Sequence, residues 1–353
     1  MKHIIEGVKF YSEPEGKPGQ QYMFCMGHTM NILAFHCSLF EDLRTFELLK
    51  AGWSFWYSPK TGNFRHAYAR SRFFFNLKTL FGVEIEALSC ADPSQFRDLS
   101  HYHICSDRPL LLWICLTPRK DDSDDGSDHM VFVGFGVDFN HDAVLLMNNR
   151  DHKLIWAPIE DIGYKFAHHR VHDFHVPGNC RMPEEDVVAD LLRNKIESNF
   201  QSSGKLPYLK RYAERLFETT HRISYREQPP AGTLCGPAGI HAMADGLALW
   251  YEDDTEWVRK RAHYACCEIM KLRYERTTFV SLVSALSTVN KRMVQDISAF
   301  WERMTESWKK GARLFSKVYM SDKKNSIVEI QEHLHFVAEE EKQILWMLRD
   351  VLG

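Results

Sequence analysis

Apolar residues recur at helical spacing near the start of the chain. In the segment MGHTMNILAFHC, Met26, Met30 and Leu33 lie three or four positions apart, which predicts a helix with one apolar face. Residues 40–52 repeat this pattern and end at a glycine, a common helix stop. A third helix is predicted over residues 67–82, so the chain begins with helices.

Apolar runs in the same half of the chain predict β-strands. They are residues 53–57, 83–88, 109–116, 129–138 and 143–148, with a further strand, turn and short helix over 155–162. Short polar turns join the last strands, which is typical of antiparallel hairpins. Helices followed by an antiparallel sheet predict an α+β fold.

The pattern changes near residue 182. Beyond it we predict no strand, and long amphipathic segments dominate to the end of the chain. A chain of 353 residues is long for one domain. We therefore expect an α+β domain over residues 1–181 and an all-α helical bundle over residues 182–353.

Composition argues against several classes of protein: nucleic-acid-binding, membrane-spanning and secreted. The net charge is −3 and basic residues are scattered, which argues against nucleic acid as a partner. No apolar run approaches the ~18 residues of a membrane span, and the N-terminal segment lacks the apolar core of a secretory signal. Nine cysteines without framework spacing indicate reduced thiols in a cytoplasmic protein. The histidines show no zinc-site spacing, so no metal is expected.

Cys25 is the candidate nucleophile. It stands at the start of the first predicted helix, where the helix dipole favours a thiolate, although a free cysteine there can also be a buried packing residue. His129 opens a predicted strand, and Asn148 ends the strand that pairs back on it. Nucleophile, base and orienting amide in this order are the papain-like arrangement.

Cys235 is a minor alternative nucleophile. It precedes Gly-Pro-Ala at a helix start, which resembles a cysteine-peptidase motif but is also ordinary helix-start chemistry. Only helices are predicted after it, and His241 lies on the same helix. No strand remains to carry a base and its orienting residue.

The segment FCMGHTMNILAFHCSLFEDLRTFELLKAGWSFWY resembles the start of the BtrH-like family, named for the butirosin-biosynthesis acyltransferase. Asn31 and Leu33 fall at the family's Asn-x-Leu positions. The strands RPLLLWICL, HMVFVGFGVD and AVLLMN resemble the core of that family. The helical half is similar too, in GPAGIHAMADGLALW and LRYERTTFVSLVSAL, so the resemblance covers nearly the whole chain.

The resemblance implies a papain-like domain, related to bacteriocin-processing peptidases, with an appended helical domain. It also implies amide-forming acyl transfer in natural-product biosynthesis, from the thioester of an acyl or peptidyl carrier protein to a small amine. Cys25 would be the nucleophile, His129 the general base and then acid, and Asn148 the residue that orients His129. No cofactor is implied beyond the phosphopantetheine of the carrier.

This sequence departs from the family at two positions. Phe24 stands where the family has His, and Gly19 stands where papain-like peptidases place the oxyanion-hole glutamine. Gln20 and Gln21 lie nearby and could serve. Otherwise the backbone N–H groups at the helix start must stabilise more of the oxyanion.

Further residues are candidates for substrate binding. Asp128 ends an acidic loop over residues 119–128, which is either a solvated hairpin loop or an attractor for a cationic acceptor. Arg273 falls where the family has an arginine, which would form an ion pair between domains or meet a phosphopantetheine phosphate. The basic stretch 308–317 could dock an acidic carrier protein, or be an exposed helix face.

The expected function is acyl transfer to an amine. A thioesterase or amidase using the same three residues is the first alternative, because it differs only in admitting water. A non-catalytic binding protein on the same fold is the second, and a homodimer is compatible with either. Under the second alternative Cys25 would be a slowly reacting, buried thiol.

Overall fold

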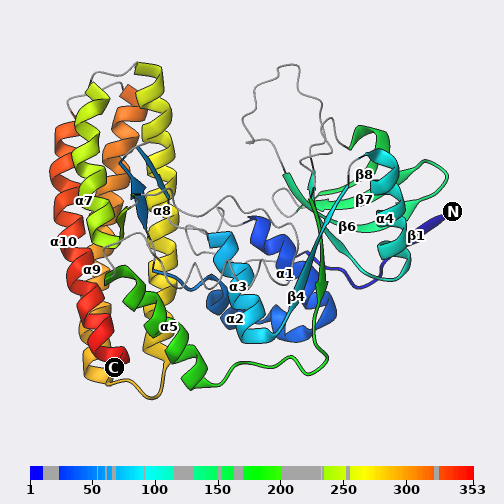
Figure 1. The fold of residues 1–353 in the computed structure, drawn as a ribbon, viewed down its shortest axis with the longest axis horizontal. Coiled ribbons are helices and arrows are strands. Elements are labelled where there is room, and N and C mark those ends of the chain that lie inside the picture. The colour runs from blue at the N-terminus through cyan, green and yellow to red at the C-terminus, as the bar shows by residue number, and fades with distance from the viewer. Residues whose placement is uncertain are drawn as a thin grey trace. The chain divides into compact units, whose positions relative to one another are not determined.

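The computed structural model describes residues 1–10, 24–53, 55–59, 62–65, 69–90, 92–114, 130–148, 153–162, 170–200, 232, 234–251, 255–321 and 326–353. Helices and an antiparallel sheet make it an α+β protein, as the residue pattern predicts (Figure 1). The chain forms two compact units. The sheet unit holds residues 1–46 and 76–182, and the helical unit holds residues 47–75 and the described residues from 183 onward.

The division between the units is not a single cut near residue 181. One boundary falls beside that position, but residues 47–75 group with the helical unit. The reason lies in strand pairing: β2 (Trp56–Ser58) pairs with β3 (Asn63–Arg65) and with β10 (Leu234–Cys235) in a small sheet. The strand predicted at 53–57 therefore does not join the main sheet, and the expectation of no strand after residue 182 is wrong.

The main sheet has seven strands among the described residues, all paired antiparallel. Their order is β4-β9-β5-β6-β7-β8, and β1 pairs with β6 as well. The strands are β1 (Lys2–Ile4), β4 (Glu84–Ser89), β5 (Leu110–Ile114), β6 (Met130–Asp138), β7 (Ala143–Asn148), β8 (Lys153–Pro158) and β9 (Arg170–His175). β1 and β9 were not predicted, and β9 lies between β4 and β5.

Two helices pack against the centre of this sheet. α1 (Phe24–His36) and α4 (Pro93–Cys105) both contact β5 and β6. Residues Val131–Asp138 of β6 are all buried, so both faces of that strand are covered. Residues Met26–Leu33 of α1 are also all buried. The single apolar face predicted for this helix is therefore wrong over Met26–Leu33, where every position is buried, while its last turn becomes exposed at His36.

The remaining elements of this part of the chain are short helices. The predicted helix 40–52 is two elements, the 3₁₀ turn η2 (Ser38–Glu41) and α2 (Leu43–Lys50). α3 (Ala69–Phe81) matches the third predicted helix, and η4 (Ile159–Asp161) follows β8. The division between the two units passes through α2 and α3.

Long helices form the helical unit. They are α5 (Glu185–Phe200), α7 (Gly236–Gly246), α8 (Thr255–Ala285), α9 (Lys291–Ser321) and α10 (Ser326–Leu352), with the 3₁₀ turn η6 (Leu247–Tyr251) after α7. α9 packs against α8 and α10, and α7 packs against α10 (Figure 1). In the described part of the chain, none of the helices combines the length and the apolar character that crossing a membrane requires.

Candidate active site

The helix that carries Cys25 begins one residue before it. Cys25 is the second residue of α1, so its backbone lies in the first turn, where amide N–H groups have no partner within the helix. A thiolate in that turn is favoured by the helix dipole. The side chain of Cys25 lies outside the described part of the structure, as do Gly19, Gln20 and Gln21.

α1 reaches the sheet close to Asn148. The Asn31 side chain donates a hydrogen bond to the sulfur of Met147, with 3.4 Å between Nδ2 and Sδ. Met147 precedes Asn148, the last residue of β7. Because a helix rises 1.5 Å per residue, Cys25 lies about 9 Å along α1 from Asn31. The structure thus places the middle of α1 beside the end of β7.

Asn148 is buried, with 4% of its surface exposed, and it pairs with Lys153 of β8. The last pair of β6 with β7 at this end is Val133↔Met147, and continuing that register by one residue would set Asn148 opposite Phe132. Side chains alternate between faces along a strand, and Asn148 therefore shares a face with positions 130 and 132. His129 and Asp128 lie outside the described residues, which resume at position 130.

Arg273 lies on α8 in the helical unit and is buried. The charge of Arg273 contributes to the lowered pKa of Glu306 on α9. The pKa of Glu306 is lowered mainly by a hydrogen bond from Lys309, and to a smaller degree by the charges of Lys309, Arg313 and Arg273. The phosphate-binding role expected for Arg273 remains a prediction.

Cys235 does not have the environment of a nucleophile. It occupies the N-cap position of α7, but burial raises the pKa of its thiol to about 11. A thiol with that pKa is protonated at neutral pH. His241, the nearest candidate base in the sequence, instead contacts His335 of α10, with 2.9 Å between their Nδ1 atoms.

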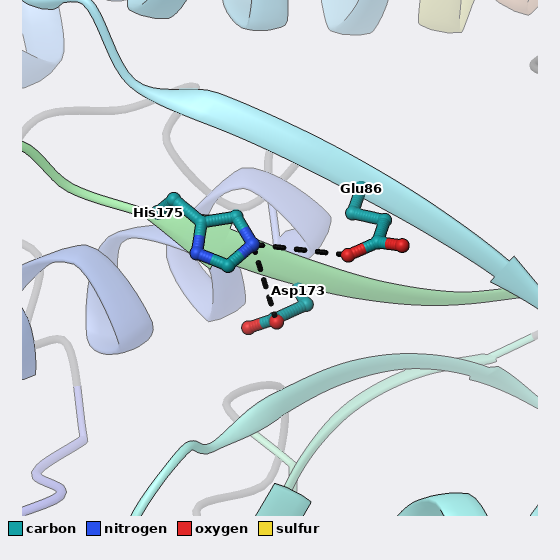
Figure 2. A group of neighbouring side chains, drawn as sticks. All are labelled: Glu86, Asp173 and His175. Carbon is teal, nitrogen blue, oxygen red and sulfur yellow. Dashed lines mark ion pairs between the residues drawn. The ribbon is translucent and has the colours of Figure 1, made fainter.

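A second cluster of ionisable groups lies on β4 and β9. Figure 2 shows His175 between two carboxylates, with its Nε2 3.8 Å from Oε2 of Glu86 and 3.7 Å from Oδ2 of Asp173. One ligand atom from each of the three residues lies within 4.8 Å of the others, which is close enough to hold a metal ion. Arg108 forms an ion pair with the same Asp173 oxygen and lies 3.3 Å from both ring nitrogens of His175.

The position of Arg108 makes this cluster a structural network. Asp173 is fully buried and needs a counter-charge, which the guanidinium supplies. A metal ion would have to compete with that cation for the same carboxylate. Burial, and secondarily the charge of Arg108, lowers the pKa of both His36 and His103, so these neighbours are neutral at pH 7. No sequence pattern indicated the cluster, because β9 was not predicted.

Comparison with protein-family models gave no match for this chain, and a search of curated proteins found no similar sequence. The function proposed below therefore rests on the site's geometry and on the resemblance described above.

Proposed function

We propose that this protein is a cysteine-dependent acyltransferase on a papain-like fold of the BtrH-like type. It would take an acyl group from a carrier-protein thioester and pass it to a small amine. The observation that carries the proposal is the position of Cys25 in the first turn of α1, a buried helix that contacts the sheet beside Asn148. The antiparallel sheet packed against this helix supports the same fold type.

The reaction needs no redox or metal step. The Cys25 thiolate attacks the thioester carbonyl, a sulfur–carbon bond forms, and the carrier thiolate leaves and takes a proton. The amine then attacks the acyl-enzyme, the bond to Cys25 breaks, and an amide forms. The first step exchanges one thioester for another, and the second runs downhill to the more stable amide.

In this proposal His129 removes the thiol proton, gives it to the leaving carrier thiol, and later accepts a proton from the amine. Histidine suits both steps because its ordinary pKa lies near neutrality. Asn148 would hold the imidazole of His129. A direct contact between Asn148 and His129 requires a change of register at this end of the β6–β7 pair. Without that change, Asn148 would face Phe132.

The remaining roles follow from the candidate binding residues. Gln21 and the backbone amides of α1 would stabilise the oxyanion. Asp128 would attract a cationic acceptor, and Arg273 would meet the phosphopantetheine phosphate. The carrier protein and the acceptor are both expected in the cytoplasm, where the thiol remains reduced.

Intact-mass analysis after incubation with short acyl thioesters of pantetheine tests the proposal. We expect one acyl adduct on the wild type and on Cys235→Ala, and none on Cys25→Ala. Cys235→Ala is the matched control, because it also removes one thiol at a helix start. An adduct that persists in Cys25→Ala, or one that is absent from the wild type, would overturn the assignment.

Adding an amine to the acylated protein then distinguishes a transferase from a hydrolase. Loss of the adduct with formation of an amide identifies a transferase, and loss to the free acid without amide identifies a thioesterase or amidase. An inert, slowly alkylated Cys25 would instead support a non-catalytic binding protein.

A further inference from the structure

Two histidines from different helices meet in the helical unit. His241 on α7 and His335 on α10 face each other through their Nδ1 atoms, 2.9 Å apart. The opposite nitrogen of each ring contacts a carboxylate of the other helix. His241 Nε2 lies 3.0 Å from Oε1 of Glu339, and His335 Nε2 lies 3.2 Å from Oδ1 of Asp245.

These contacts determine where each neutral imidazole carries its proton. An ionised carboxylate can only accept a hydrogen bond, so the nitrogen beside it must be the N–H donor. His241 Nε2 makes such a contact with Glu339, and the Asp245 carboxylate 3.2 Å from His335 Nε2 favours the proton on that nitrogen as well. With both protons on Nε2, each Nδ1 carries a lone pair. Two lone pairs facing each other at 2.9 Å repel unless a positive species lies between them.

From this geometry we propose that His241 and His335 bind a divalent transition-metal ion of the zinc class through their Nδ1 atoms. Histidines that bind metals typically donate their other ring N–H to a carboxylate. His241 Nε2 is hydrogen-bonded to Glu339, and His335 Nε2 lies within ion-pair distance of Asp245. Two neutral imidazoles supply no charge, whereas Asp245 and Glu339 together balance the two positive charges of the ion.

Both rings must turn to hold such an ion. Their centroids lie 5.2 Å apart, so the two Nδ1 atoms point almost directly at each other. A tetrahedral ion with zinc–nitrogen bonds of about 2.0–2.1 Å needs the two nitrogens about 3.3 Å apart, with both lone pairs directed at the ion. Both side chains can move, because 34% of the His241 side chain and 39% of the His335 side chain are exposed. Water can enter and complete the coordination.

The sequence carries a signature of this site on each helix. His241 and Asp245 are four residues apart on α7, and His335 and Glu339 are four residues apart on α10. Each carboxylate lies one turn from the histidine of its own helix but pairs with the histidine of the other. A metal ion between the rings would therefore cross-link α7 to α10 and stabilise the folded helical unit.

Calorimetric titration with Ni²⁺, an imidazole-binding probe, tests the site on the full chain. We expect the wild type to bind one more ion than His241→Gln or His335→Gln. Glu339→Gln keeps both imidazoles and should weaken this site by about 10- to 100-fold. His141→Gln is the matched control, since it removes an exposed histidine of the sheet unit and should leave the titration unchanged.

A second readout keeps the test independent of folding defects. The thermal midpoint of the wild type should rise with added Ni²⁺, and the part of this rise due to the site should be lost in His241→Gln. Circular dichroism checks that each variant is folded. Equal stoichiometry and affinity in the wild type and both histidine variants would overturn the proposal and indicate that the rings share only a proton.

Discussion

Glu341 and Arg276 form an ion pair in which neither side chain is exposed to solvent. Nε of Arg276 lies 2.6 Å from Oε1 of Glu341 in the core of the helical unit. The indole N–H groups of Trp53 and Trp308 donate hydrogen bonds to the two oxygens of the same carboxylate, at 2.8 and 3.1 Å. Both indole rings also face the guanidinium, at 5.2 and 5.7 Å. Residues from four distant segments thus meet at one buried charge pair.

Glu341→Gln should strongly destabilise the helical unit. It removes the negative charge that Arg276 faces while nearly preserving the volume, and breaking a buried pair costs about 3–5 kcal/mol. Urea denaturation, followed by far-UV circular dichroism, measures the loss. Glu332→Gln is the control, because Glu332 is exposed on the same helix. Equal unfolding midpoints for the two variants would contradict a structural role for the pair.

Gly239→Ala should also destabilise the helical unit, although alanine ordinarily favours a helix by about 1 kcal/mol. A Cβ at position 239 would lie 2.7 Å from the backbone oxygen of Leu234, so α7 or β10 must shift. We expect a net loss of about 1–3 kcal/mol, the usual cost of overpacking. The same denaturation experiment measures it, and a stabilised variant would show that the two elements separate easily.

Cys235 and Cys90 should be among the slowest thiols to alkylate. Burial, the largest cause at both sites, raises the pKa of each thiol to about 11. At pH 7 only about one thiol in 10,000 is then ionised, and the thiolate is the reactive form. Peptide mapping after timed iodoacetamide treatment should show exposed Cys105 reacting first among these three. Faster reaction at Cys235 would reinstate it as a candidate nucleophile.

Asp138 should make the sheet unit acid-sensitive. A hydrogen bond from His141 is the largest of the contacts that lower the pKa of this carboxyl to about 2, and Asn140 and Lys2 contribute others. A carboxyl with a lowered pKa stabilises the fold above its unfolded value near 4, and this contribution is lost as pH falls toward 2.

The comparison with Asp138→Asn isolates that contribution. The wild type should have the higher unfolding midpoint at pH 7, and the difference should close between pH 4 and pH 2. A difference that stays constant with pH would assign the effect to packing or hydrogen bonding and not to the charge.

The residue pattern predicted the apolar strands at the centre of the sheet and missed β9, which is not mostly apolar. β5, β6 and β7 read as continuous apolar runs and were predicted close to their observed bounds. β9 has the sequence RVHDFH, and its His172 and Asp173 are fully buried. Its burial depends on β4 and β5 on either side and, for Asp173, on the counter-charge of Arg108. Local hydrophobicity contains none of that information.

By itself, the sequence determined the α+β class, the helical second half and Cys25 at a helix start, because these follow from local periodicity and helix-end chemistry. Only the tertiary structure decided the grouping of residues 47–75, the burial of α1 over Met26–Leu33 and the meeting of His241 with His335. Each of these depends on pairing or packing between segments far apart in the chain. Such contacts are set by the competition of all possible partners and not by the residues of either segment alone.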